Sequence, residues 1–346
     1  MKIVAILGAR EEYLACEVLK GLHRMGVELI TSKPLNEYKR QVDTFNSGAS
    51  NDLPLDQPYY TDEEMVEHSK DADYIFVFWN RFINPTDTNI GGRIYLVDKI
   101  NQPDKTVVID GSECSHTGNG HGAVWKDSTN YQKGSALGHS WIWEYMRERS
   151  KWYFKRETFP EDVQEHNIIP CPYPTRIEDR RESLIGLDKD VFMACVFGHV
   201  NTGLRAEINK SCNNLKSKYG NSISVGGGIN REEYLNLVSR SGMIVDAWGA
   251  GSNCTVRRNE VVMNSTAVIG QKWEIIVPDD YTDGVNIINY KDVNEFEEKV
   301  DYYFNNQEKL IEIGENGYQH ALKYHTTEKR MKYIFDIIKG NLKWEF

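Results

Sequence analysis

The sequence places two adjacent arginines where they could stabilise a negative charge. Arg257 and Arg258 follow the small-residue turn GAGSNCT, at the expected start of a helix that Ser252 or Thr255 could cap. Cations at a helix N-terminus meet the positive end of its dipole, and a bound anion would remove that conflict. A diphosphate leaving group, which gains charge as its bond breaks, is such an anion. The alternative is a pair of solvated surface arginines.

A second phosphate-facing group is expected in FGHVNTGLRAEINK, directly after an apolar strand. Gly198 ends that strand, and Arg205 could reach a diphosphate, with Lys210 a weaker choice. His199 could pair with a phosphate or a sugar hydroxyl, although a lone loop histidine is usually just solvated. Asp246 ends the strand MIVDAWG, where it could serve as a base, contact a ribose or simply form a turn.

Titratable side chains also gather after one strand of the first half. Asp110, Glu113 and His116 follow the apolar run KTVVI within seven positions. A transferase that inverts configuration needs a general base to deprotonate the acceptor hydroxyl, and any of the three could supply it. The alternative is structural, because Asp-Gly-Ser is also a common turn. The sequence therefore predicts candidate catalytic residues here without choosing between these readings.

The elements that must position these residues alternate between strands and helices. Short apolar runs such as KIVAILG, KTVVIDG, VFMACVFG and MIVDAWG alternate with amphipathic stretches, which is the pattern of parallel sheets covered by helices. The 346 residues are too many for one core, since single cores stop growing near roughly 250–300 residues. We therefore predict an α/β fold of two Rossmann-like, doubly wound domains that face each other across a cleft, with a helical C-terminal tail.

The boundary between the two domains is expected in a stretch rich in proline and charge. We predict an N-terminal acceptor domain over residues 1–160, a linker over 161–189, and a C-terminal donor domain with the tail over 190–346. Ligands of such sheets bind outside the carboxyl ends of the strands. One domain could then hold an activated donor and the other an acceptor.

Several common nucleotide and metal motifs are absent from the sequence. The first turn, ILGAREEYL, lacks the glycines of a dinucleotide fingerprint, and no Walker motif is present. The glycine-rich GGGIN at 226–230 has no lysine at the required offset, so we interpret it as a strand-to-helix turn. Two Asp-x-Asp strings, Asp71 to Asp73 and Asp188 to Asp190, both precede their expected strands. We therefore expect no metal ion and no cofactor.

Composition limits the class of protein further. The net charge of −10 argues against non-specific binding of nucleic acid, which depends on many Lys and Arg contacts to phosphate. The six cysteines are scattered singly, without the pairs of a zinc ribbon or a redox dithiol. The N-terminus resembles a first strand rather than a signal peptide, and no apolar stretch is long enough to span a bilayer. We expect a soluble, cytoplasmic protein.

The C-terminal half resembles the spore-maturation CgeB-like branch of the GT-B glycosyltransferases. The resemblance runs from Tyr234 to about Arg330 and rests on the helix TVRRNEVVMNSTAVI, the acidic loop DDYTDGVNIINYKD and the closing GENGYQHALKYHTTEKR. In the first half it is limited to KWYFKRE and VVIDGSE. Ser265 is a departure, because related transferases usually place glycine there.

The resemblance implies a donor, a chemistry and a role for one carboxylate. The donor would be an NDP-sugar such as a UDP-sugar, and Glu260 would accept hydrogen bonds from the ribose hydroxyls, which suits a group with two acceptor oxygens. Transfer would be metal-independent and retaining, with the leaving phosphate as base. The acceptor stays open between a glycan, a protein, a metabolite and a hydroxymethylated DNA base. Alternatives are a nucleotide-sugar epimerase or a non-catalytic binding protein, and the oligomeric state is undetermined.

Overall fold

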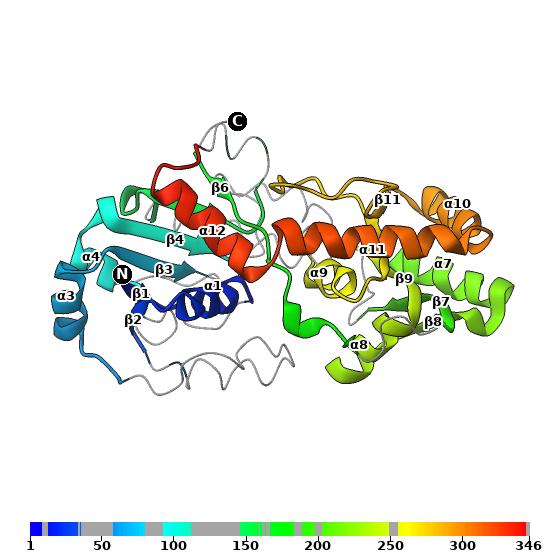
Figure 1. The fold of residues 1–346 in the computed structure, drawn as a ribbon, viewed down its shortest axis with the longest axis horizontal. Coiled ribbons are helices and arrows are strands. Elements are labelled where there is room, and N and C mark those ends of the chain that lie inside the picture. The colour runs from blue at the N-terminus through cyan, green and yellow to red at the C-terminus, as the bar shows by residue number, and fades with distance from the viewer. Residues whose placement is uncertain are drawn as a thin grey trace. The chain divides into compact units, whose positions relative to one another are not determined.

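The computed structural model divides the chain into two compact units, each an α/β structure (Figure 1). Unit 1 comprises Met1–Tyr173, Ile275–Pro278 and Arg330–Phe346, and unit 2 comprises Pro174–Glu274 and Asp279–Lys329. The residues that the structure describes are 1–8, 13–33, 35, 58–79, 93–111, 146–158, 160, 163, 167–182, 189–197, 203–248 and 255–343. Within these ranges no helix has the length and apolar character needed to cross a bilayer.

Unit 1 is built on a six-stranded sheet in which every pairing is parallel. The strand order is β2-β1-β3-β4-β5-β6. The inner strands are apolar and buried along almost their whole length, as expected for a sheet covered on both faces. The strands are β1 (Lys2–Ile6), β2 (Glu28–Thr31), β3 (Tyr74–Trp79), β4 (Thr106–Asp110), β5 (Trp152–Lys155) and β6 (Ile169–Pro170), and the helices include α1 (Tyr13–Arg24), α3 (Asp62–Lys70) and α4 (Leu96–Ile100).

Unit 2 holds a five-stranded parallel sheet in the order β11-β10-β9-β7-β8. Its strands are β7 (Val191–Val196), β8 (Ile223–Gly226), β9 (Ser241–Asp246), β10 (Ala267–Gln271) and β11 (Ile288–Tyr290). Its helices are α7 (Gly203–Tyr219), α8 (Arg231–Arg240), α9 (Val256–Val262), α10 (Val293–Phe304) and α11 (Gln307–Tyr324), and a short 3₁₀ turn spans Ile177–Asp179.

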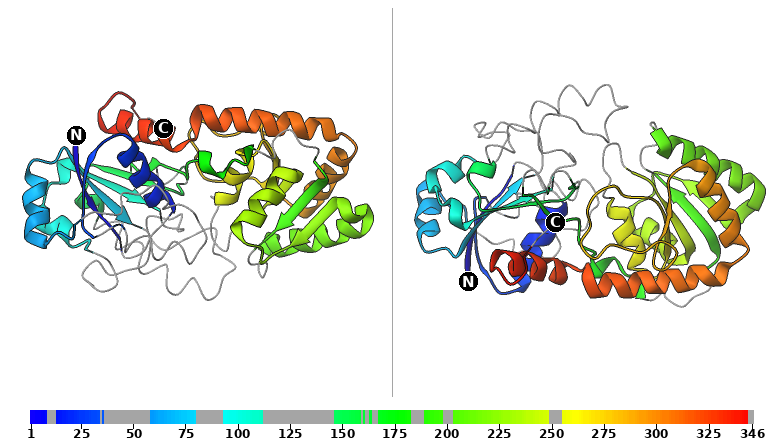
Figure 2. Two further views of the ribbon diagram at one scale, coloured as in Figure 1. Left: turned by 60° about the horizontal axis from the view of Figure 1, so that its bottom comes forward. Right: turned by 90° about the horizontal axis from the view of Figure 1, so that it is seen from above.

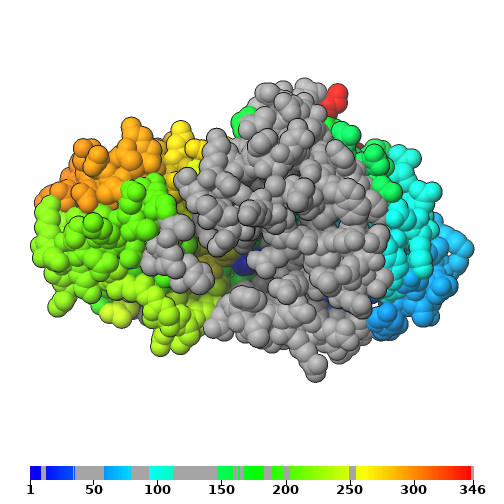
Figure 3. Space-filling model, turned by 180° about the vertical axis from the view of Figure 1, so that it is seen from behind, coloured from blue at the N-terminus to red at the C-terminus, as the bar shows by residue number. Residues whose placement is uncertain are grey.

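Alternation along the central strands of unit 2 explains why helices cover both faces of its sheet (Figure 2). Met193 and Cys195 belong to an apolar cluster that includes residues of α7 and α10. Ala194, between them, packs instead with residues of α8, α9 and α11. Successive side chains of a strand point to opposite faces, so one strand serves two layers. Figure 3 shows α7 and α10 side by side on the surface, where Lys218 and Asp301 form an ion pair at 2.8 Å.

The predicted fold class is confirmed in its two parallel α/β sheets and its helical C-terminus, but the boundaries of the domains differ from those expected. The last helix, α12 (Thr327–Ile338), mostly joins unit 1 because the Phe335 ring packs 6.2 Å from that of Tyr74 and 6.3 Å from that of Phe76. The segment Ile275–Pro278 also belongs to unit 1, where the Ile276 amide donates to the Thr158 carbonyl at 2.8 Å. The stretch expected as a linker, 161–189, is divided between the two units.

The carboxyl ends of the strands in unit 2 lie at one edge of the sheet, because all of these strands are parallel. Val196 ends β7, Gly226 ends β8 and Asp246 ends β9. The helices α8 and α9 begin after this edge. A binding site in a sheet of this kind is expected here.

Candidate functional site

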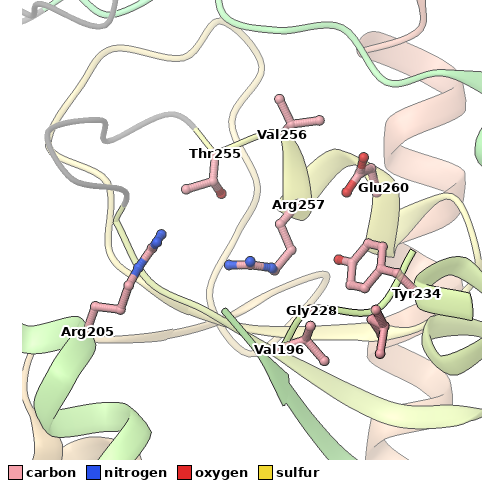
Figure 4. Close-up of a pocket in the computed structure, with 9 residues that line it drawn as sticks. Val196, Arg205, Gly228, Tyr234, Thr255, Val256, Arg257 and Glu260 are labelled. Atoms are coloured by element: carbon pink, nitrogen blue, oxygen red, sulfur yellow. The ribbon is translucent and has the colours of Figure 1, made fainter. Parts of the chain in front are cut away.

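A cavity of about 350 Å³ opens at this edge of unit 2. Figure 4 shows the Arg205 guanidinium reaching toward it from α7 and the Arg257 guanidinium from α9. A volume in this range is typical of small-molecule sites. The lining residues are Val196, Arg205, Gly228, Ile229, Tyr234, Thr255, Val256, Arg257 and Glu260.

The two arginines that line this cavity both contact one aromatic side chain. Arg205 and Arg257 lie 5.0 Å and 4.9 Å from the ring centroid of Phe197, which follows β7. Arg205 also donates from Nη2 to the Ala247 carbonyl at 2.7 Å. Burial, with the repulsion of Arg257 as a second cause, lowers the pKa of Arg205 to about 10. Two partly desolvated cations beside an open volume favour an anionic ligand.

Adjacent residues of a helix point about 100° apart, and the arginine pair divides accordingly. Arg257 lines the cavity. Arg258 is only 2% exposed and packs on a different side of α9. The Arg258 guanidinium lies 3.7 Å from the centre of the Trp273 ring and donates from Nη2 to the Gln271 carbonyl at 2.9 Å. Arg257 is therefore the arginine of the pair that lines the cavity, whereas Arg258 packs within the protein.

Asp246 is buried beneath the arginines and holds the start of α9. Both of its carboxylate oxygens lie 2.8 Å from the Thr255 hydroxyl, which donates to them. Arg257 and Arg258 each lie 3.6 Å from the same carboxylate. Thr255 occupies the N-cap position of α9 but makes no side-chain capping bond, since its hydroxyl is turned to Asp246. Asp246, at 1% exposure, therefore anchors the site rather than lining it.

Glu260 lines the cavity and is held from behind by a third arginine. Arg231, the first residue of α8, donates from Nη1 to Glu260 Oε1 at 2.6 Å and from Nη2 to Asp179 Oδ1 at 2.5 Å. Asn264 ties the same elements together, donating to the backbone carbonyls of Glu260 and Asp179 at 3.0 Å each. Burial raises the pKa of the Glu260 carboxyl, and Arg231 opposes that rise. The carboxylate is thus fixed in one orientation at the cavity wall.

The glycine-rich segment contributes more to the cavity than the sequence suggested. Gly228 and Ile229 line it, although we interpreted this stretch only as a turn. A Cβ on Gly227 would lie 2.6 Å from the Phe197 carbonyl oxygen, so the loop after β8 approaches the end of β7 as closely as the backbone allows. Three glycines at a strand end were the available signal. Tyr234 and Arg231, in contrast, occupy ordinary positions of an amphipathic helix and gave none.

The candidate base of unit 1 is engaged in a buried pair. Asp110, at the end of β4, accepts at Oδ2 from the Tyr153 hydroxyl at 2.7 Å and from Lys155 Nζ at 3.0 Å. Its predicted companions Glu113 and His116 lie outside the described residues, as do the donor-site candidates Gly198, His199 and Ser252.

A family model matches the C-terminal part of the chain. Residues 199–336, which include most of unit 2, match a family model described as "Glycosyl transferase-like". No curated protein sequence matches the chain.

Solved structures resemble the whole chain in fold. A glycosyltransferase from Rickettsia africae has a TM-score of 0.57 at 12% identity, with 99% of each chain covered. A sucrose-phosphate synthase from Thermosynechococcus elongatus gives 0.57 at 10%, again with 99% of each covered. An alpha-glucosyltransferase in complex with UDP-glucose and DNA containing an abasic site gives 0.54 at 12%, covering 98% of this chain and 99% of the other. The fold is therefore of the GT-B type, and its second unit is glycosyltransferase-like in sequence.

Proposed function

We propose that this protein is a glycosyltransferase that moves a sugar from an NDP-sugar, first of all a UDP-sugar, to a hydroxyl acceptor. The observation that carries the proposal is the pair of guanidinium groups of Arg205 and Arg257, which flank Phe197 at a cavity that Glu260 also lines. The position matches the edge where open α/β sheets bind ligands. The alpha-glucosyltransferase of similar fold binds UDP-glucose, which makes uridine nucleotides the first donors to test.

The residues of the cavity suit the chemistry of a departing diphosphate. As the bond between sugar and phosphate breaks, negative charge grows on the leaving oxygens, and prepositioned cations stabilise it more than they stabilise the intact donor. Arg205 and Arg257 would meet that charge, so we propose transfer without a metal ion. Glu260, oriented by Arg231, would accept the ribose hydroxyls.

We further propose retention of configuration, with the leaving phosphate taking the proton of the acceptor. The support is that Asp110, a candidate base in unit 1, already accepts two hydrogen bonds at the same oxygen. The order of motifs in the C-terminal half also favours the CgeB-like branch, which we propose as the affiliation of the chain.

The test is release of nucleoside diphosphate from a panel of UDP-, GDP-, ADP- and dTDP-sugars, with and without a mixture of acceptors. The acceptors would be glycans, proteins, small metabolites and DNA containing hydroxymethylated bases. Release that depends on an acceptor, survives EDTA and is lost in Arg257→Ala supports the proposal. Arg240→Ala, which removes an exposed arginine paired with Asp190, is the matched control. Epimerised sugar without release identifies an epimerase, and binding without turnover identifies a non-catalytic protein.

A further inference from the structure

Tyr234 presents to the donor cavity a hydroxyl whose proton has no acceptor among the described residues. The residue lies in the first half of α8, and its ring packs beside the apolar cluster of Val238, Ile244 and Val261. Its side chain also lines the cavity, and Figure 4 shows the hydroxyl directed toward Arg257. That hydroxyl oxygen is buried, and although the Arg257 guanidinium interacts with it, no described residue accepts its proton.

The neighbours of this hydroxyl determine what could satisfy it. A phenol is both a donor and an acceptor, whereas a guanidinium only donates, so Arg257 can offer nothing to the phenolic proton. Burial raises the pKa of Tyr234, with the nearby Glu260 carboxylate as the next cause, so the hydroxyl keeps its proton at neutral pH. A buried donor without an acceptor costs free energy, and a ligand that brings an acceptor oxygen removes that cost.

A phosphate oxygen is the acceptor that best fits this position. The hydroxyl lies beside Arg257, whose own Nε is also buried without a hydrogen-bond partner in the described part of the chain. Two unsatisfied donors that face one cavity, one of them cationic, match the crowded acceptor oxygens of a phosphate group. A neutral ligand would satisfy the phenol but bring no negative charge to the two arginines, Arg205 and Arg257, that line the cavity.

We propose that Tyr234 is a donor-binding residue whose phenolic hydroxyl gives its proton to a phosphate oxygen of the bound nucleotide, next to Arg257. This inference rests on the proposed function. The Tyr234 hydroxyl would add an uncharged, directional hydrogen bond to the contacts that the arginines make with the phosphate.

The substitution Tyr234→Phe isolates this contact, because it keeps the ring that packs on the apolar cluster and removes only the hydroxyl. Without ligand, the proton that the variant loses has no acceptor among the described residues, so the melting temperature should stay near that of the wild type. With ligand, it loses a hydrogen bond to a charged group, so its affinity for nucleoside diphosphate should fall about tenfold. The thermal shift on binding should shrink accordingly.

Tyr219→Phe is the matched control, because it makes the same chemical change at a hydroxyl that has a partner. Tyr219 closes α7 and donates to Asp301 at 2.5 Å. Its loss should lower the melting temperature and leave nucleotide affinity unchanged. Tyr234→Phe should therefore lower the affinity without lowering the melting temperature, and Tyr219→Phe should lower the melting temperature without lowering the affinity.

The experiment measures binding of UDP, GDP, ADP and dTDP to the full chain by calorimetry, and takes the tightest diphosphate and its nucleoside forward to the variants. A tenfold loss for the diphosphate in Tyr234→Phe, with nucleoside binding unchanged, supports the proposal. Equal affinities of wild type and variant for the diphosphate overturn it, as does an equal loss for nucleoside and diphosphate. If the wild type binds none of the four, the proposed function itself fails. If the wild type binds and Tyr234→Phe binds equally well, only the role of the hydroxyl fails.

Discussion

The two sheets carry ionisable groups at the carboxyl ends of their strands, but they balance them differently. In unit 1, Asp110 at the end of β4 pairs with Lys155 at 3.0 Å, and Arg156 pairs with Glu157 at 2.8 Å. All four side chains are 3% exposed or less. Each charge thus has an opposite partner within the protein, as buried charges require.

In unit 2, the described residues that line the cavity include two cations, Arg205 and Arg257, and one carboxylate, Glu260. Arg231 already pairs with Glu260 and Asp179. Arg257 and Arg258 share one carboxylate, Asp246, at 3.6 Å each, and Arg205 and Arg257 both approach the Phe197 ring. Burial lowers the pKa of Arg205, and the repulsion of Arg257 adds to that effect. Paired charges in unit 1 serve the fold, whereas the excess of positive charge in unit 2 suits an anion that comes from outside.

The largest expected effect comes from breaking the balanced pair in unit 1. Lys155→Met should lower the free energy of unfolding by about 3–5 kcal/mol, because it leaves the buried Asp110 carboxylate without its cation. Lys70→Met, which removes an exposed pair with Glu67, should change it by about 0.5 kcal/mol or less. Urea denaturation measures both. Similar small losses in the two variants would mean that Asp110 is not held by Lys155 and that the contrast between the sheets is wrong.

The arginine pair tests the other side of the comparison. Arg257→Ala should lower turnover about a hundredfold or more, since it removes a cation that meets charge in the transition state, while its melting temperature stays near that of the wild type. Arg258→Ala should instead lower the melting temperature, because that guanidinium packs on Trp273 and bonds the Gln271 carbonyl. Steady-state kinetics and thermal melts on both variants separate the roles. If Arg258→Ala lost turnover and Arg257→Ala lost stability, the roles assigned to the two arginines would be reversed.

The alternation of strands and helices and an anion site at the arginine pair could both be predicted from the sequence, because both rest on local patterns. The period of apolar residues gives strands and helices, and a turn of small residues before two arginines suggests an anion site. The sequence could not choose between Arg257 and Arg258, because that choice depends on where Trp273 and Gln271 lie relative to α9.

Contacts between distant segments explain what the sequence did not reveal. The docking of α12 on unit 1 joins Phe335 to Tyr74, and no short-range pattern encodes such a contact. Arg231 and Tyr234 escaped notice for a related reason. They belong to the site only because the start of α8 lies beside α9, which brings Arg231 within 2.6 Å of Glu260.

Gly227 and Gly228 test whether the loop beside the cavity of unit 2 is fixed by close backbone contact or by its conformation. Gly227→Ala should lower the free energy of unfolding by about 1–3 kcal/mol, because the new Cβ would lie 2.6 Å from the Phe197 carbonyl oxygen. Gly228→Ala meets no atom within 4 Å and costs only the strain of its φ of +73°, about 1 kcal/mol. Denaturation curves rank the two. A larger loss at Gly228 would mean that conformation, and not contact, fixes this loop.

The smallest effect expected is the pH dependence of Glu260, which should act on stability and on binding with opposite signs. Burial raises the pKa of this carboxyl, so the folded chain holds the proton to a higher pH than the unfolded chain. The contribution of Glu260 to the free energy of unfolding therefore falls as the pH rises from the ordinary value of 4.5 through the raised pKa. Affinity for nucleoside diphosphate should rise about two- to tenfold over the same interval, because only the ionised carboxylate accepts from both ribose hydroxyls. Calorimetric titrations across this interval should show the rise in the wild type, no rise in Glu260→Gln, and a rise displaced to higher pH in Arg231→Gln, which loses the cation that favours ionisation. A wild-type profile that matches that of Glu260→Gln would remove Glu260 from the nucleotide site while leaving the arginine pair in place.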